Sequence, residues 1–439
     1  MPDQSPTYNL RAVIRETGLQ AETIRAWERR YGLPKPQRSS GGHRLYSLHD
    51  IQMLKWLTDR IGEGMTISRA VEMWRVLEAE GNDPLQINAS IPAPAQHPNG
   101  SIDNLRKAWI ESCQFFDEQG AERALTQAFA ISSPEAACIG ILQRGLSEMG
   151  ELWYAGEVSV QQEHFASALA MRRLHTLIAA SPPATRNARL LASCPPGEEH
   201  EFGLLLMTFL LRRRGWDVVY LGANVPLQRL QETLRSTSPR LVISLAQTLP
   251  SAASLRTVSL FLQDLKVPLA YGGKIFLQEP GLRELISGHF LGESIADSPA
   301  SVERILQSPG KLGTTLPPET QYDGLLKVYL NHAAQIDASV SRRMEEHGIR
   351  PQHLEIANRT FAQHLAAAIS LGDIGLLNNS IRWVEGLLRN AGLDSEMVKE
   401  FLCQYGNVVE EYLKEQAGPI IGWIERQTEN GCQEKTETV

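Results

Sequence analysis

Residues 190–203 read Leu-Leu-Ala-Ser-Cys-Pro-Pro-Gly-Glu-Glu-His-Glu-Phe-Gly, and this stretch places a histidine where a strand gives way to a helix. The short apolar run Leu190–Cys194 predicts a buried strand, and a helix is expected from about Glu201. A residue at the carboxyl end of such a strand faces the crevice in which open α/β sheets bind ligands. His200 is therefore a candidate ligand-facing residue.

Two neighbours of His200 suit a metal-binding role. Glu198 is two residues away, and its carboxylate can hydrogen-bond the ring nitrogen that does not face the ligand. That bond would fix the tautomer and make the imidazole a better metal donor. Gly203 would let a large group pass close to the backbone. An ordinary surface histidine near carboxylates is the alternative, and this stretch alone does not separate the two.

The strand-then-helix pattern occurs five times between Arg189 and Leu306. The further strands are expected at Val218–Leu221, Leu241–Leu245, Pro268–Tyr271 and Phe290–Leu291. Five such units predict a doubly wound, parallel, Rossmann-like sheet. Ser244, at the end of its strand, and Gly272-Gly273, after the next, would share the carboxyl edge with His200. A hydroxyl and two positions without side chains would let a long planar group lie between the strands.

Length and composition divide the rest of the chain. A chain of 439 residues exceeds one core, and a net charge of -7 excludes a nucleic-acid binder that is basic throughout. The absence of a signal peptide and of any apolar run of about 20 residues predicts a cytoplasmic protein. The five cysteines show no CxxC spacing and are expected to be free thiols. The expected parts are a DNA-binding domain at 7–80, a linker at 81–101, a four-helix bundle at 102–182, the α/β domain at 188–308, a helical domain at 320–427 and a disordered tail at 428–439.

The amino-terminal part is locally basic. Helices at Leu10–Arg15 and Ala21–Tyr31, joined by Thr17-Gly18-Leu19, predict a helix-turn-helix, and Arg38–Tyr46 predicts a hairpin wing with glycines at its tip. Between Gln20 and Tyr46 there are six Lys or Arg residues and two Glu residues. Such a basic patch in an acidic protein is typical of phosphate contact.

Residues 23–32, Thr-Ile-Arg-Ala-Trp-Glu-Arg-Arg-Tyr-Gly, and residues 41–47, Gly-Gly-His-Arg-Leu-Tyr-Ser, resemble the DNA-binding domain of the MerR family over about seventy residues. The resemblance implies a winged helix-turn-helix that binds double-stranded operator DNA as a dimer. It places Arg25 and Arg29 on bases and phosphates, and Arg44 and Tyr46 on backbone phosphates. The full set of candidate DNA-binding residues is Thr23, Arg25, Arg29, Arg30, Arg38, His43, Arg44 and Tyr46.

The α/β motifs resemble the cobalamin-binding fold of methionine synthase and the methylmalonyl-type mutases. In those proteins a DxHxxG histidine displaces the cofactor's own base from cobalt, and the nucleotide tail lies beside a Ser and a Gly-Gly. Here Glu198 replaces the aspartate. The resemblance implies His200 as the cobalt ligand, Glu198 as its hydrogen-bond partner, and Gly203, Ser244, Gly272 and Gly273 around the cofactor.

The bundle resembles that of the light-sensing cobalamin regulators of the CarH and LitR type, through Trp153 and through Glu163-His164 ten positions on. In that group the bundle covers the upper face of adenosylcobalamin, the tryptophan packs over the adenosyl group, and Glu-His helps to hold it. One residue departs from the pattern. Tyr154 stands where those regulators have the histidine that takes the upper cobalt position after light. A neutral phenol is a poor cobalt ligand, which puts a bis-histidine photoproduct in doubt.

The helical segment from Gln321 to Arg426 leaves two hypotheses open. It carries His332, His347, His353, His364, Trp383, Tyr405, Tyr412 and Trp423 at helical spacing. The favoured hypothesis is a bundle for oligomerisation or partner docking, with its aromatics in the core. The other is a second ligand such as a bilin, as in the photocobilin group, held without a covalent bond because no cysteine lies in an attachment motif.

These features together predict a cobalamin-dependent, light-responsive transcription regulator and not an enzyme. Adenosylcobalamin would set the oligomeric state, dimer or tetramer, and the resemblance implies a repressor that releases DNA in light. Three alternatives stay open. They are a corrinoid-carrying methyltransferase or mutase subunit, a cobalamin sensor that does not respond to light, and a dual cobalamin and bilin photoreceptor.

Overall fold

The chain forms two units, Met1–Asn99 and Gly100–Val439, in a computed structural model. The structure describes residues 6–38, 42, 44–62, 66–79, 100–307, 322, 324–346, 351–379, 381 and 395–428. His43, His347, Trp383 and Cys432, the side chain of His353, and nearly all of the expected linker and tail lie outside the described residues.

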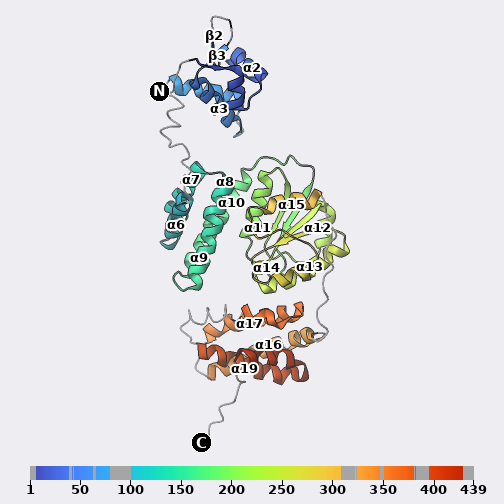
Figure 1. Ribbon diagram of the computed structural model, residues 1–439. Coiled ribbons are helices and arrows are strands. Elements are labelled where there is room, and N and C mark those ends of the chain that lie inside the picture. Colours follow the sequence, from blue (N-terminus) through green and yellow to red (C-terminus); the bar gives the residue numbers. More distant parts are fainter. Residues whose placement is uncertain are drawn as a thin grey trace. The chain divides into compact units, whose positions relative to one another are not determined.

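The first unit is a helix-turn-helix with a small sheet (Figure 1). Its elements are β1 (Tyr8–Asn9), α1 (Leu10–Thr17), α2 (Ala21–Tyr31), β2 (Gln37–Arg38), β3 (Arg44–Tyr46), α3 (Leu48–Gly62) and α4 (Ile67–Ala79). The strands pair antiparallel in the order β1-β3-β2, so the predicted wing hairpin is present. Gly18 and Gly32 end the two helices with φ of +69°, a conformation that glycine adopts without strain. The predicted winged helix-turn-helix is confirmed.

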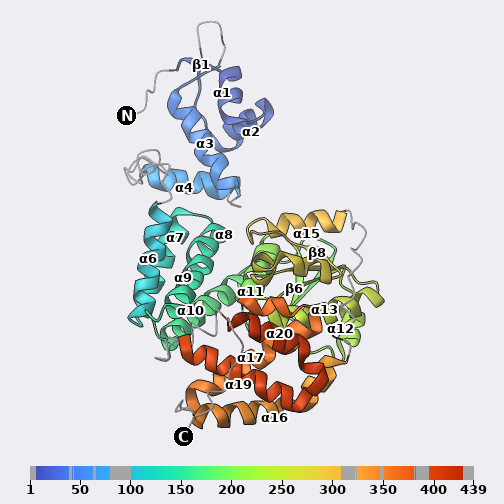
Figure 2. The ribbon, with the colours of Figure 1, turned by 60° about the horizontal axis from the view of Figure 1, so that its bottom comes forward.

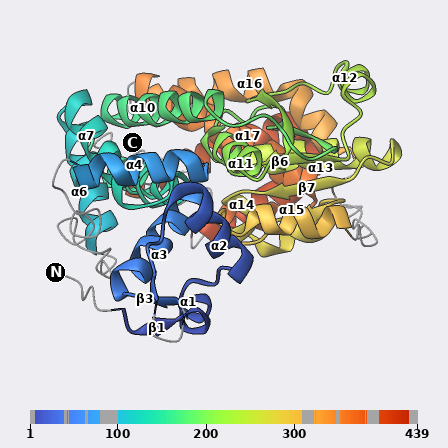
Figure 3. The same cartoon turned by 90° about the horizontal axis from the view of Figure 1, so that it is seen from above.

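The second unit begins with a bundle of four helices. They are α6 (Gly100–Gln114), α7 (Glu118–Ile131), the run of α8 (Pro134–Ala137), a π-helical turn (Cys138–Gln143) and α9 (Arg144–Tyr154), and α10 (Val160–Ala179). Asp117, Ser133 and Ser159 cap the second, third and fourth of these helices through their side chains. Trp109 is fully buried in the bundle core. Figure 3 shows α10 beside α11 (Phe202–Arg213), the first helix of the α/β domain, with which it is in contact.

The α/β domain contains a parallel five-stranded sheet. Its strands are β4 (Arg189–Ser193), β5 (Asp217–Gly222), β6 (Leu241–Leu245), β7 (Leu269–Gly272) and β8 (His289–Phe290), in the order β5-β4-β6-β7-β8. The strand order reverses at β4, so β4 and β6 flank the switch point, where sheets of this kind bind ligands. The doubly wound parallel sheet predicted from the sequence is confirmed.

Helices cover both faces of this sheet because its strands are apolar on both sides. Leu190 and Ile243 belong to the core under α11 and α15 (Ser298–Gln307). Leu191 and Val242 belong to the core under α12 (Leu230–Thr237), α13 (Leu249–Asp264) and α14 (Ile275–Gln278). A helix was expected near Gly281–Ile286, and the structure instead has a short 3-10 helix at Pro280–Leu285, directly after α14.

The carboxyl-terminal helices share a core with the α/β domain. They are α16 (Leu325–Glu346), α17 (Pro351–Leu371), a 3-10 turn (Ile374–Leu376), α19 (Ser395–Leu413), a second 3-10 turn (Lys414–Ala417) and α20 (Gly418–Gln427). Figure 2 shows α17 alongside α13, and the two helices are in contact. One continuous apolar cluster includes Leu255 of α13, Phe361 of α17 and Trp423 of α20.

Phe361 lies at the centre of this aromatic core. It is fully buried, and its ring centroid lies 5.6 Å from Phe401, 4.7 Å from Tyr405 and 6.1 Å from Trp423. Replacing Phe361 with Ala is expected to lower the free energy of unfolding by about 3–5 kcal/mol, because it removes apolar contacts and leaves a cavity. Ile356→Ala is the control on the same helix, since Ile356 is 54% exposed. Urea denaturation of both variants tests this, and equal losses would contradict the assigned core position.

Three of the five cysteines are buried free thiols, namely Cys113, Cys138 and Cys194. Burial raises the pKa of each to about 12, so these thiols are unreactive at neutral pH. Cys403 is disulfide-bonded, so the expectation of a free thiol is wrong for this residue. Within the described residues, no helix is long and apolar enough to cross a membrane.

Candidate functional site

His200 is held by a buried carboxylate at the carboxyl edge of the sheet. Glu198 is fully buried, and its Oε1 accepts hydrogen bonds from the backbone N–H of His200 at 2.8 Å and from its ring Nδ1 at 2.7 Å. The imidazole is nevertheless 70% exposed. Within the described residues Nε2 has no hydrogen-bond partner, so in the neutral ring with Nδ1 donating to Glu198 this nitrogen keeps its lone pair. A carboxylate on one nitrogen and an open second nitrogen are what a metal-binding histidine needs.

The second oxygen of Glu198 binds the start of helix α13. Its Oε2 accepts the backbone N–H of Gln247 at 2.6 Å, directly before the N-cap Thr248. Burial alone would raise the pKa of Glu198, but the hydrogen bonds from the His200 ring and from the backbone N–H groups of Gln247 and His200 outweigh it and lower the pKa. Glu198 is therefore ionised at neutral pH. Its hydrogen bond in turn raises the pKa of His200.

The loop that follows β5 supports residues 197–200, here called the histidine loop. Asn224, which follows β5, has φ of +50° and makes three hydrogen bonds to the histidine loop. Its backbone N–H donates to the Glu198 carbonyl at 2.9 Å, its Nδ2 donates to Glu199 at 2.8 Å, and its Oδ1 accepts from Gly197 N–H at 2.9 Å. Asparagine tolerates this left-handed conformation better than most residues. The loop that presents His200 is thus fixed at three consecutive positions.

The remaining sheet-edge residues lie near this loop with different roles. Ser244 is buried, and its hydroxyl donates to the Ser193 carbonyl on the neighbouring strand at 2.7 Å. Gly273 has φ of +123°, and a Cβ there would lie 1.8 Å from the Ala246 carbonyl oxygen, so only glycine fits. A Cβ at Gly272 or Gly203 would meet ordinary contacts, 3.4–3.5 Å from Leu245. No described neighbour therefore requires glycine at Gly203.

The bundle presents a second carboxylate and histidine pair. Glu163, on the first turn of α10, accepts a hydrogen bond from the Nδ1 of His164 at 2.7 Å and another from the Ser167 hydroxyl at 2.9 Å. Trp153, at the end of α9, is half-buried against the bundle core, and Tyr154 is 38% exposed. The negative charge of Glu163 also contributes to raising the pKa of His200. The Glu163–His164 pair and the Glu198–His200 pair are therefore close enough to interact electrostatically.

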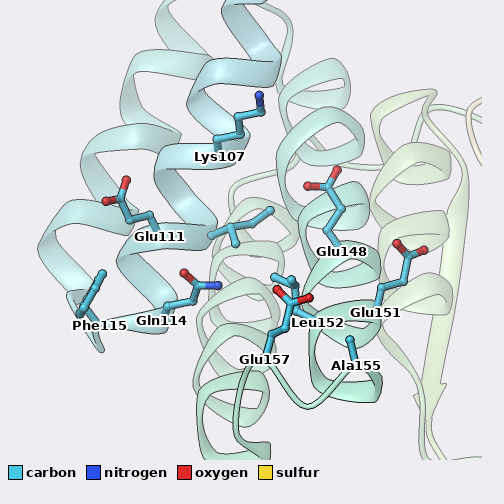
Figure 4. Close-up of a pocket in the computed structure, with 10 residues that line it drawn as sticks. Lys107, Glu111, Gln114, Phe115, Glu148, Glu151, Leu152, Ala155 and Glu157 are labelled. Atoms are coloured by element: carbon cyan, nitrogen blue, oxygen red, sulfur yellow. The ribbon is translucent and has the colours of Figure 1, made fainter. Parts of the chain in front are cut away.

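A separate cavity of about 580 Å³ opens between α6 and α9. Figure 4 shows Lys107 and Glu111 on one side of it and Glu148 and Glu151 on the other. Ile110 and Leu152 supply apolar lining. Its described lining residues include none of the predicted cofactor residues, so this cavity is distinct from the site around His200.

The predicted DNA-binding residues fall into two groups. Arg25, Arg29, Arg30 and Arg38 are exposed, and the first three lie on α2. Thr23 is half-buried on the same helix. Arg44 of the wing is half-buried and pairs with Glu28 at 2.9 Å, which ties β3 to α2.

Tyr46 belongs to the interior. It is fully buried among Val13, Ile24 and Ile51, and its hydroxyl has no hydrogen-bond partner within the described residues. The phosphate contact expected from the sequence is therefore not available to Tyr46 in this structure, since its ring completes the core beneath the wing.

Sequence reasoning missed two residues that position the histidine, namely Asn224 and Gln247. Gln247 binds Glu198 through its backbone N–H, and the sequence does not reveal a hydrogen bond made by the backbone.

Comparison with known proteins identifies the helix-turn-helix domain and the helical bundle. Residues 8–76 match the MerR HTH family regulatory protein model, and residues 105–178 match a B12 binding domain model. The HTH-type transcriptional repressors CarA and CarH of Myxococcus xanthus are 34% identical over 238 residues and 33% identical over 236 residues. Each alignment covers 54% of this chain, with 75% of CarA and 77% of CarH. The methanol–corrinoid protein of Methanosarcina barkeri is 28% identical over 112 residues, which are 25% of this chain and 43% of that protein. The chain therefore belongs to the family of HTH-type transcriptional repressors that includes CarA and CarH, with a MerR-type DNA-binding domain and a B12-binding domain.

Proposed function

We propose that this transcription regulator binds adenosylcobalamin, and that light acting on the bound cofactor changes its oligomeric state and its affinity for operator DNA. The observation that carries the proposal is the His200–Glu198 pair, an exposed imidazole held through Nδ1 by a fully buried carboxylate. This arrangement suits a lower axial ligand to cobalt, because the carboxylate fixes the tautomer and leaves Nε2 for the metal.

We assign the surrounding residues to the rest of the cobalamin site. Gly203 lies on the helix that follows the histidine loop, and Gly272 and Gly273 lie at the end of β7, so we assign them to the edge along which the nucleotide tail would lie. The hydroxyl of Ser244 is engaged within the sheet, so we assign it a role in shaping the tail site. On the bundle side, Trp153 offers a flat apolar face and Glu163-His164 offers hydrogen-bonding groups for an adenosyl group. When bound, adenosylcobalamin supplies a cobalt–carbon bond that visible light breaks.

Tyr154 makes the upper face different from that of the regulators in which a histidine follows the tryptophan. A phenol stays protonated at neutral pH and donates poorly to cobalt. The Nδ1 of His164 hydrogen-bonds Glu163, and the side chain is 75% exposed. Its Nε2 is therefore a better cobalt donor on this face than the Tyr154 hydroxyl. A cobalamin sensor without a light response is the alternative that this substitution leaves open.

We assign DNA binding to the exposed arginines of α2 and the wing, in a homodimer or tetramer acting on an operator in the cytoplasm. A corrinoid-carrying methyltransferase subunit is the competing function, and the likeness to the methanol–corrinoid protein favours it. That function leaves the arginines of α2 without a role, so we propose a regulator and not an enzyme.

For the carboxyl-terminal helices we favour a packed structural or docking domain over a bilin site. Tyr329, Phe361, Tyr405 and Trp423 are buried against one another, and the Tyr329 and Tyr405 hydroxyls lie 2.7 Å apart. The half-buried His364, whose pKa is lowered to about 4 by desolvation, is a neutral histidine of this domain that a bilin could contact. Reconstitution with biliverdin distinguishes the two, since a bilin site would add an absorption band in the red.

The proposed function is tested by DNA binding in darkness and in light. Adenosylcobalamin-loaded protein is expected to retard its own promoter fragment in the dark and to release it after green illumination, with a matching change in the cobalamin spectrum. His200→Ala is the control, and its DNA binding should be the same in darkness and after illumination. Equal retardation in both conditions, with an unchanged spectrum, would exclude a light-responsive regulator.

A further inference from the structure

Gln247 lies between the cofactor residues and the carboxyl-terminal helices. It precedes Thr248, the N-cap of α13, and its backbone N–H donates to Glu198 Oε2 at 2.6 Å. Its side-chain Oε1 accepts the backbone N–H of Lys274 at 3.0 Å. One residue thus joins the carboxylate behind His200 to two segments, the start of α13 and the loop after Gly273.

The first connection runs along α13. Glu198 accepts the backbone N–H of Gln247, the residue directly before the N-cap of this helix. Beyond its first turn, α13 makes apolar contacts with α17. It contributes Leu255 and Leu262 to the core that contains Phe361. A shift at the start of α13 is therefore transmitted to close-packed side chains, which do not absorb it without repacking.

The second connection runs through α14. Lys274, held by Gln247, directly precedes α14, and Glu279 directly follows it. The Glu279 carboxylate accepts a hydrogen bond from the side-chain amide of Asn379, which follows α17 in the chain. Both connections start at Gln247, and both end at the carboxyl-terminal helices.

We infer that the carboxyl-terminal helical domain reads the state of His200 through Glu198, Gln247 and helix α13, so that cobalamin binding and the rigidity of α17 are coupled. This inference rests on the proposed function. A ligand that fixes the His200 ring also fixes Glu198, since moving this buried carboxylate would leave the backbone N–H groups of His200 and Gln247 without an acceptor. Coupling is reciprocal, so the helices that are stiffened by cobalamin must in turn favour its binding.

Hydrogen–deuterium exchange of the full chain, with and without hydroxocobalamin in the dark, tests this coupling. We expect amide exchange in 357–371 of α17 to slow at least about fivefold on cobalamin binding, together with 249–264 of α13. Exchange in the bundle helix α7, on which neither connection runs, is the internal reference.

The double variant Gln247→Ala with Ser251→Ala removes the side-chain hydrogen bond to Lys274 and breaks the capping box at the start of α13, while leaving His200 and Glu198 in place. We expect it to keep cobalamin but to slow exchange in α17 less than about twofold. Gln263→Ala, an exposed position near the end of the same helix, is the control and should behave as the wild type.

Three outcomes overturn the inference. Wild-type protein that co-elutes with cobalamin but shows unchanged exchange in α17 overturns the coupling and leaves the proposed function standing. A double variant with full protection of α17 overturns the path through Gln247. Protein that takes up no cobalamin overturns the proposed function and the inference together.

Discussion

Replacing Glu198 with Gln is expected to lower the free energy of unfolding of the apoprotein by about 2–4 kcal/mol at neutral pH. Glu198 is fully buried, and one of its oxygens accepts from His200 while the other accepts from Gln247. A glutamine has one acceptor oxygen and one donor group, so one of these N–H groups would face another donor. The cobalamin-loaded variant should also lose the spectral signature of cobalt coordinated by a protein imidazole, because the ring is no longer oriented.

The effect of this substitution depends on pH. Because the pKa of Glu198 is lowered from the usual 4.5, the stability that its charge contributes is present above pH 4.5 and is lost as the pH falls through the lowered value. Denaturation of the two proteins at pH 7 and in acid should therefore show the difference shrinking on acidification. Glu199→Gln is the control, since Glu199 is exposed and bonded only to the Asn224 side chain among the described residues. Equal losses for Glu198→Gln and Glu199→Gln would contradict the role given to the buried carboxylate.

Replacing Arg25, Arg29 and Arg30 together with Ala is expected to weaken operator binding on the order of 10³-fold. All three side chains are exposed on α2, and Arg25 and Arg29 lie one turn apart on the same face. Each arginine lost from a phosphate or a base costs about 1–3 kcal/mol. None is buried, so the fold of the first unit should be unaffected.

The salt dependence of binding measures how many of these arginines contact phosphate. The slope of log K against log salt should fall by about 0.9 for each phosphate contact removed. Arg123, Arg172 and Arg235 replaced together are the matched control, since they are exposed residues of the second unit and remove the same charge. Unchanged affinity in the α2 variant, or an equal loss in the control, would show that α2 does not read DNA.

The sequence predicted the elements of the fold well because their signals are local. Helix α2 begins and ends as its basic, glycine-terminated pattern predicts, and the five strands follow from short apolar runs. The hydrogen bond between Glu198 and His200 was also predictable, since the two residues are only two positions apart. Contacts between segments that are far apart in the sequence could not be predicted in this way. The residues around Tyr46 do not indicate that its ring is part of the core, and those around Leu255 do not indicate that a helix about a hundred residues later packs against α13.

The single core formed by the α/β domain and the carboxyl-terminal helices limits how this chain can be rearranged. Multidomain regulators commonly exchange output modules at the linkers between them, since each module keeps its own interior. Here a cut after α15 would expose the apolar side of α13 to water. A cobalamin domain of this lineage that lacks the last helices should therefore carry polar residues where this chain has Phe261 and Leu265, and a fusion made without those changes should aggregate.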